Sequence, residues 1–154
     1  MAATLLSLDN DVFRAFATYA TVVVVKTMLM SGITAVTRFK NKAFINPEDA
    51  ASMKDKDGKP LKPFTHQDVE RVRRCHLNDL ENVIPFVLIG LLYVTTNPSL
   101  STALLHFRIF AAARILHTFA YLIPLPQPSR AMLFMAGLLA TLSMAYNVFS
   151  KGLL

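Results

Sequence analysis

The chain has 154 residues, 53% of them hydrophobic, and carries a formal net charge of +6. Its mean hydropathy of +0.41 is well above that of a soluble domain, which excludes an ordinary water-soluble enzyme and indicates a membrane protein. The single cysteine, Cys75, excludes an intrachain disulfide, so stability must come from helix packing.

Four apolar blocks follow one another along the chain, each near the roughly 20 residues that a membrane-spanning helix needs. We expect an all-α fold, an integral membrane four-helix bundle formed by a single transmembrane domain of residues 1–154. The backbone polar groups of such spans are satisfied within the helices, as lipid requires. The expected helices cover about residues 12–37, 76–96, 101–122 and 129–149.

The first block is not a signal peptide, because Asp9 and Asp11 precede it where a signal peptide carries positive charge. The loop of residues 38–75 holds ten lysines and arginines, whereas the turn around residues 95–102 holds no charge. By the positive-inside rule this loop is cytosolic and both termini lie on the other side. The net charge then reflects topology and anionic lipid headgroups, and we expect no nucleic acid partner.

Within this loop, the run FINPEDA at residues 44–50 predicts a short helix that begins at Pro47. An asparagine before the proline and acids after it are typical of a helix start. Asp49 has two interpretations, an ordinary first-turn acid that complements the helix dipole or a functional carboxylate.

Cys75 opens the run CHLNDLENVIPF, in which polar residues begin a helix that enters the membrane. Basic neighbours would make its thiol reactive if it were exposed, but we favour a passive small residue on the helix. We expect neither a metal nor a nucleotide cofactor, because zinc-ligand spacings and phosphate-binding glycine loops are missing from the sequence.

A polar stripe follows one face of the second helix and consists of Arg71, Arg74, Asn78 and Glu81. Ionisable groups at membrane depth face a bundle interior or a wet cavity, so a functional site is the default and structural ion pairing the alternative. Asp79 points elsewhere. We expect it to form a structural pair with Lys26, the lone charge inside the first helix.

The third helix repeats the pattern, with Arg114, His117 and Tyr121 on one face. Taken singly, they could be a snorkelling cation, an interhelical hydrogen bonder and an interface aromatic. Arg130 stands in the first turn of the fourth helix, where a cation opposes the helix dipole and an anion-binding role fits better than a stabilising one.

Together these side chains describe an arginine-rich polar pocket at the cytosolic leaflet. Arginines suit carboxylates, and Glu81 suits an ammonium group, so the ligand should be anionic overall yet zwitterionic. A small peptide-like thiol such as glutathione meets this description, and so do several amphiphiles.

Three runs of the sequence carry a family resemblance: VERVRRCHLNDLENVIPF at residues 69–86, ARILHTFAYL at residues 113–122 and PLPQPSR at residues 124–130. Together with NPEDA they resemble the membrane-associated proteins in eicosanoid and glutathione metabolism, from about residue 12 to the end of the fourth helix. The resemblance implies a homotrimer of four-helix bundles, with one glutathione between neighbouring protomers near the cytosolic face.

The resemblance also implies an activity and a location. The activity is conjugation of glutathione, as co-substrate, to hydrophobic electrophiles, together with reduction of lipid hydroperoxides. The location is the endoplasmic reticulum membrane, with the mitochondrial outer membrane as a second site. Arg130 falls on the family's thiol-stabilising arginine. The positions implied to bind glutathione are Arg38, Arg74, Asn78, Glu81, His117 and Tyr121, and those implied to support them are Asp49 and Arg114.

Two alternatives within the same family stay open. One is a prostaglandin E synthase-like isomerase, although Leu77, Ala131 and Phe134 stand where that branch has arginine, serine and tyrosine. The other is a non-catalytic scaffold that presents lipids to a partner enzyme. A scaffold needs apolar grooves and no thiol-activating cation, so Arg130 and Glu81 argue against it.

Overall fold

The structure is a computed structural model, and it describes residues 5–152. Its helices are α2 (Asp11–Asn41), α3 (Pro47–Ala51), α4 (Gln67–Thr95), α5 (Leu100–Leu122) and α6 (Ser129–Gly152). Within the described residues, α2, α4, α5 and α6 are long and apolar enough to cross a membrane. The all-α expectation with four spans is therefore confirmed.

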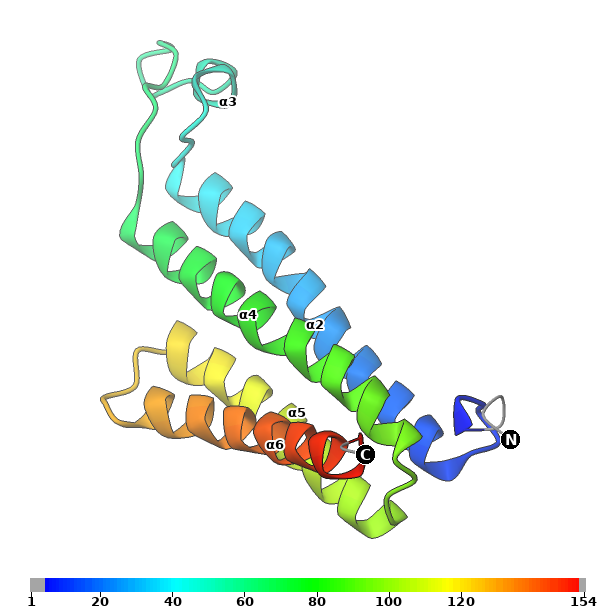
Figure 1. Cartoon of the computed structure of the whole chain (residues 1–154). Helices are drawn as coiled ribbons and strands as arrows, with labels where there is room; N and C mark the ends of the chain where they lie inside the picture. The colour runs from blue at the N-terminus through cyan, green and yellow to red at the C-terminus, as the bar shows by residue number, and fades with distance from the viewer. Residues whose placement is uncertain (1–4, 153–154) are drawn as a thin grey trace.

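The four long helices pack as two antiparallel pairs, α2 with α4 and α5 with α6 (Figure 1). The short helix α3 lies beyond the end of α2 and the start of α4, and the start of α2 and the end of α6 lie at the opposite end of the bundle, toward the two chain termini. The end of α2, the start of α4, the end of α5 and the start of α6 consequently share the α3 end. The polar residues expected to form a site belong to these four segments, except Asp49, which lies in α3.

Helix α4 begins at Gln67, nine residues before the expected start at residue 76. His66 caps it, since its Nδ1 accepts a hydrogen bond from the backbone N–H of Asp68 at 3.2 Å, and acidic residues occupy the first turn. Helix α2 likewise continues to Asn41, and Lys42 ends it in a left-handed conformation with φ 52°. Hydropathy locates only the apolar part of each helix, and the polar turns outside the apolar part are equally helical.

An aromatic cluster forms the core of the bundle toward the chain ends. The rings of Phe86 and Phe110 stack with centroids 3.8 Å apart, and Phe16 lies 5.6 Å from Phe107. Gly90 permits the close packing of α2 on α4, because a Cβ atom there would lie 2.4 Å from the Phe16 ring. Small residues have this role in membrane helix packing, where shape complementarity replaces the hydrophobic effect.

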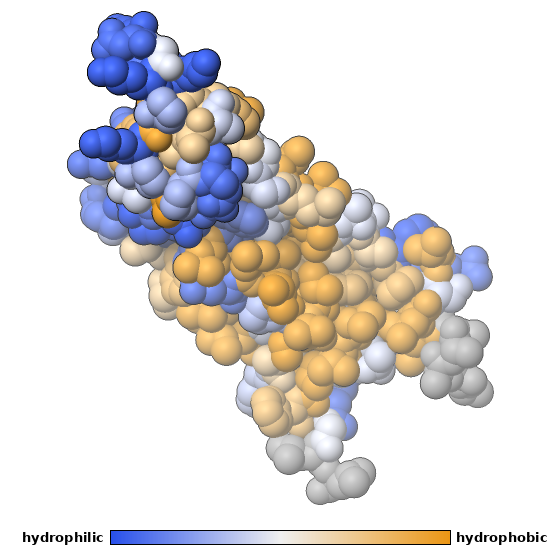
Figure 2. Space-filling view, turned by 90° about the horizontal axis from the view of Figure 1, so that it is seen from above, coloured by the Kyte–Doolittle hydropathy of each residue, from blue (hydrophilic) through white to orange (hydrophobic). Residues whose placement is uncertain are grey.

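The surface is apolar along the bundle and polar at its α3 end (Figure 2). Large apolar side chains such as Met28 and Val36 on α2 and Met132 and Leu142 on α6 are exposed. Exposed apolar side chains on long apolar helices suit a multi-pass membrane protein, in which lipid covers them.

Candidate functional site

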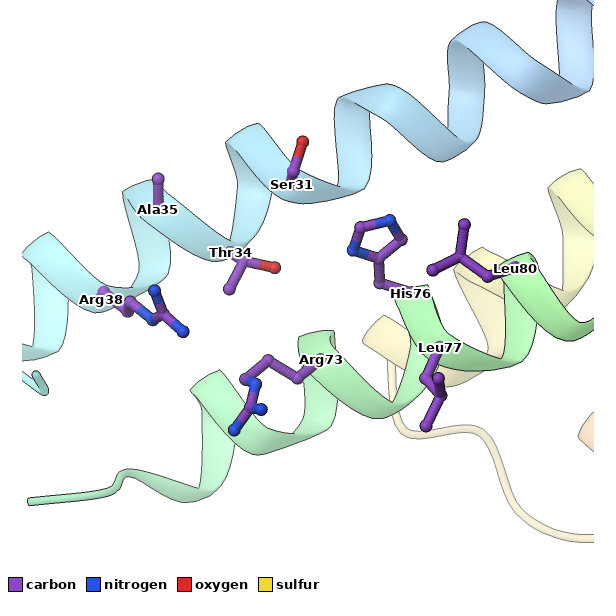
Figure 3. Close-up of a pocket in the computed structure, with 8 residues that line it drawn as sticks. All are labelled: Ser31, Thr34, Ala35, Arg38, Arg73, His76, Leu77 and Leu80. Atoms are coloured by element: carbon purple, nitrogen blue, oxygen red, sulfur yellow. The ribbon is translucent and has the colours of Figure 1, made fainter. Parts of the chain in front are cut away.

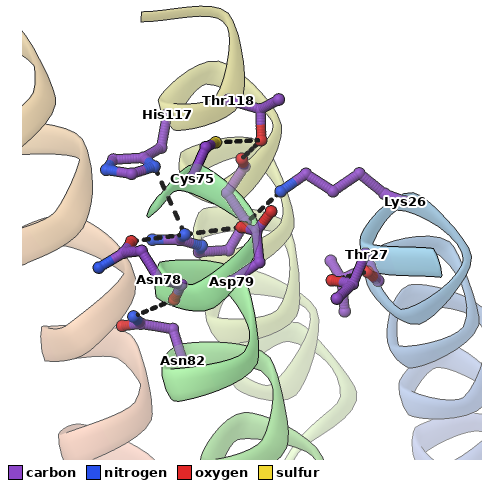
Figure 4. Close-up of polar contacts among 10 residues, drawn as sticks. Lys26, Thr27, Cys75, Asn78, Asp79, Asn82, His117 and Thr118 are labelled. Atoms are coloured by element: carbon purple, nitrogen blue, oxygen red, sulfur yellow. Dashed lines mark hydrogen bonds and ion pairs between the residues drawn. The ribbon is translucent and has the colours of Figure 1, made fainter. Parts of the chain in front are cut away.

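A buried group of three charges, Lys26, Asp79 and Arg114, links α2, α4 and α5. Figure 4 labels Lys26 and Asp79 within it. One oxygen of Asp79, Oδ1, lies 2.5 Å from Lys26 Nζ and 2.7 Å from Arg114 Nη2. The side chains of Asp79 and Arg114 are fully buried. The expected Lys26–Asp79 pair is confirmed, but the sequence interpretation missed Arg114 as the second cation on the same carboxylate.

Arg114 also contacts two of the residues expected to bind the ligand. Its Nη2 donates to Asn78 Oδ1 at 2.9 Å and lies 3.4 Å from His117 Nδ1. A guanidinium can only donate hydrogen bonds, so Nδ1 of His117 is the acceptor and the proton of the neutral imidazole is on Nε2.

The polar contacts continue from α5 to α6 through Tyr121. The rings of His117 and Tyr121 have centroids 5.6 Å apart, and the guanidinium carbon of Arg130 lies 5.0 Å from the centroid of the Tyr121 ring. This arrangement is a cation–π contact. The start of α6 is thereby joined to the site. We call this connected set the polar row: Asn78, Arg114, His117, Tyr121 and Arg130.

Arg38 lies outside the polar row. It lines a cavity of about 350 Å³ between α2 and α4, whose wall includes Thr34, Arg73 and Leu77 (Figure 3). It also lines a second cavity of about 170 Å³ together with Asp49. No residue of the polar row lines either cavity. Within one chain, Arg38 and Asp49 are therefore brought together with each other but not with the polar row.

Arg74 and Glu81 lie on the outer face of α4, and both are exposed. Among residues 5–152 neither side chain forms a hydrogen bond or an ion pair. A carboxylate at membrane depth is costly unless it faces another polar group. Glu81 is therefore open to a ligand or to a second chain beside it.

Three arginines carry buried guanidinium nitrogens that have no acceptor among the described residues. These nitrogens are Nε of Arg38, Nε and Nη1 of Arg114, and Nε of Arg130. A buried donor without a partner costs roughly 1–3 kcal/mol, and more when it is charged. A bound anion would satisfy these donors, so the arrangement is suited to an anionic ligand.

Cys75 is completely buried. Its Sγ lies 4.0 Å from Thr118 Oγ1, and it packs in a small cluster with Met30 and Val72. A reactive thiol must be accessible to solvent, so the burial of Cys75 agrees with its interpretation as a passive small residue. Within residues 5–152, no group of three or more metal-ligating side chains is close enough to hold an ion.

Known proteins resemble this chain over nearly its whole length. The MAPEG family model matches residues 16–150. Microsomal glutathione S-transferase 1 of Mus musculus is 55% identical over 148 residues, which is 95% of this chain and 94% of that protein. The Homo sapiens protein of the same name is 54% identical over the same shares. Prostaglandin E synthase of Homo sapiens is 35% identical over 96% of this chain and 95% of its own.

Proposed function

The chain belongs to the MAPEG family, the membrane-associated proteins in eicosanoid and glutathione metabolism, and from this premise we propose that it is a membrane-bound glutathione transferase. It conjugates the glutathione thiolate to lipophilic electrophiles, and it also reduces lipid hydroperoxides with glutathione. Its relatives with transferase names share 53–55% of their aligned residues with it, against 35% for prostaglandin E synthase.

The observation that carries this proposal is the set of unpartnered buried nitrogens on Arg38, Arg114 and Arg130. Glutathione offers carboxylates and a thiolate as acceptors for these donors, and guanidinium groups bind carboxylates in a bidentate geometry. Its ammonium group would pair with Glu81, which is exposed on α4 without a counter-ion. One zwitterionic ligand thus satisfies both the unpaired cations and the unpaired acid.

We assign Arg130 the catalytic role of stabilising the thiolate. A free thiol is only a few per cent ionised near pH 7, whereas the thiolate is the nucleophile. The Arg130 guanidinium stays protonated and is partly buried in the first turn of α6. Each tenfold rise in thiolate population needs about 1.4 kcal/mol of differential stabilisation. The sulfur then bonds to the electrophilic carbon, whose leaving group departs with the electron pair.

The other site residues have binding and supporting roles. Those that hold glutathione are Arg38, Arg74, Asn78, Glu81, His117 and Tyr121. Arg114 supports Asn78 and His117 through its hydrogen bonds, and Asp49 lies beside Arg38 at the smaller cavity. The electrophile reaches the thiolate laterally from the lipid.

We further propose that the chain acts as a homotrimer, in which Arg38 of one protomer completes the polar row of its neighbour. The separation of Arg38 from the polar row within one chain supports this assembly. So does the unpaired charge of Glu81 on the outer face of α4. The α3 end then faces the cytosol, in the endoplasmic reticulum membrane.

Mixing two inactive variants tests the shared site. Arg38→Ala and Arg130→Ala chains are refolded together, and conjugation is compared with that of each variant alone. If the site lies between protomers, random assembly leaves about a quarter of the interfaces with both arginines intact, and activity returns in proportion. Activity that stays at the level of the separate variants would place each site within one protomer.

The isomerase alternative is weakened by Leu77, because this apolar residue lines the cavity beside Arg73 where that branch has arginine. The scaffold alternative does not explain the buried arginine nitrogens that have no acceptor. The scaffold alternative predicts no conjugation of glutathione to an aryl halide.

Conjugation kinetics with a lipophilic aryl halide test the proposed function. We expect glutathione-dependent halide release by the wild type, and a loss of roughly 10²-fold in kcat for Arg130→Ala at saturating glutathione. Arg14→Ala is the matched control, since Arg14 is an exposed arginine at the other end of the bundle that pairs with Asp11. A wild type without conjugation would exclude the transferase, and an unchanged Arg130→Ala variant would exclude the role of Arg130.

A further inference from the structure

We propose that Asp79 is a positioning residue of the glutathione site, which acts through Arg114 on the side chains of Asn78 and His117. Asp79 is fully buried, and its contacts are to Lys26 and Arg114 rather than to the residues proposed to bind the ligand. The identity of the ligand rests on the proposed function, whereas the positioning itself is a property of the protein without ligand.

The geometry around one nitrogen atom carries the proposal. Nη2 of Arg114 has three acceptors within reach: Asp79 Oδ1 at 2.7 Å, Asn78 Oδ1 at 2.9 Å and His117 Nδ1 at 3.4 Å. A guanidinium NH₂ group has only two hydrogens, so these acceptors compete. The shortest contact, and the charged one, is with Asp79. Asp79 therefore holds Nη2 of Arg114 in place, and Asn78 and His117 share the remaining hydrogen of that nitrogen.

This arrangement fixes the donor and acceptor roles of both neighbours. Because Asn78 Oδ1 accepts from Arg114, the amide nitrogen of Asn78 is left as a donor. Because His117 Nδ1 faces the same guanidinium, the proton of the imidazole is on Nε2. Both side chains thus present N–H groups, as an anionic ligand requires.

The charge balance of Lys26, Asp79 and Arg114 also favours an anionic ligand. Lys26 and Arg114 share the single carboxylate of Asp79, so the three groups together carry a formal charge of +1. Arg114 also keeps Nε and Nη1 without an acceptor among the described residues. Asp79 neutralises one cation and orients the other, and the surplus positive charge matches an anion beside Arg114.

A double variant separates positioning from plain structural support. Asp79→Asn alone leaves two buried cations and is expected to fold poorly. Asp79→Asn combined with Lys26→Met restores the formal charge of +1 and nearly preserves side-chain volume, but it lacks the charged acceptor that orients Arg114. Asp68→Asn is the matched control, because Asp68 is an exposed carboxylate in the first turn of the same helix.

Two readouts are measured on the folded double variant in detergent. The KM for glutathione is expected to rise about tenfold while kcat at saturation changes less than about twofold, because the loss falls on ligand binding. The ¹⁵N spectrum of His117, identified by its loss in His117→Gln, should change from the Nε2–H tautomer of the wild type to a mixture. Asp68→Asn should match the wild type in the KM for glutathione and in the His117 tautomer.

A folded double variant with the wild-type KM and the wild-type His117 tautomer would overturn the proposal and leave Asp79 with a structural role only. The tautomer is compared without glutathione. A wild type that does not use glutathione would therefore overturn the proposed function, while the tautomer comparison still decides whether Asp79 positions His117.

Discussion

The two ends of the bundle differ in whether their polar side chains have hydrogen-bond partners. Toward the chain ends, His106 bonds Ser143 at 2.9 Å and Arg108 bonds Tyr19 at 3.1 Å around a packed aromatic core. In this half, the buried Tyr93 hydroxyl has no hydrogen-bond partner among residues 5–152. Toward α3, three arginines keep unpartnered buried nitrogens. Buried donors without acceptors are tolerated mainly at functional sites, so the contrast supports the proposal that the α3 half is the one that binds the ligand.

The largest expected effect breaks the ion group in the α3 half. Asp79→Ala leaves Lys26 and Arg114 buried without their shared carboxylate, which should destabilise the protein by about 3–5 kcal/mol. Asp11→Ala removes the exposed partner of Arg14 near the chain ends and should cost less than about 1 kcal/mol. Thermal unfolding in detergent compares the two. Equal losses would mean that the buried group contributes no more than a surface pair.

A change in the other half should affect stability but not ligand binding. Gly90→Ala places a Cβ atom against the Phe16 ring and should cost about 1–3 kcal/mol through overpacking. Gly32→Ala is its control, since a Cβ there meets no atom within 4 Å. Gly32→Ala should leave the free energy of unfolding unchanged or raise it by up to about 1 kcal/mol. A raised KM for glutathione in a folded Gly90→Ala protein would contradict the division into two halves.

The converse change should affect ligand binding but not stability. Glu81→Gln removes an exposed carboxylate that pairs with no described residue, so the unfolding midpoint should stay the same. Glutathione affinity should fall about tenfold, or about 1.4 kcal/mol, through loss of the pair with the ligand ammonium. Equilibrium dialysis measures the Kd, with Glu70→Gln as the control on the same helix. A destabilised Glu81→Gln protein with unchanged Kd would assign Glu81 a structural role.

The smallest effect is expected at Cys75, which lies in the binding half but is buried away from solvent. Cys75→Ala should change conjugation by less than about twofold, because the thiol packs as a small apolar group. A maleimide should label Cys75 in the folded protein far more slowly than in the denatured protein. Rapid labelling of the folded protein, followed by a change in activity, would instead indicate a reactive sensor.

The sequence predicts the four spans and the Lys26–Asp79 pair well, because length, apolarity and the cost of lone charges in lipid leave few choices. It does not predict the start of α4 at Gln67, since hydropathy cannot detect helical turns that lie in water.

The sequence also misses Arg114 as the second partner of Asp79. Helical periodicity shows which residues share a face of one helix. It does not show how each helix is rotated against its neighbours, and the contact between Arg114 and Asp79 depends on that rotation. The spacing of three between Arg114 and His117 was the available signal, and it identified the face without its partner.

The ultraviolet absorbance of the glutathione thiolate tests the central claim most directly. Detergent-solubilised protein is titrated with glutathione at neutral pH, with the wild type beside Arg130→Ala and Arg14→Ala. We predict a saturable thiolate signal in the wild type and in Arg14→Ala that is lost in Arg130→Ala. A signal of equal size in Arg130→Ala, or none in the wild type, would contradict thiolate activation by Arg130.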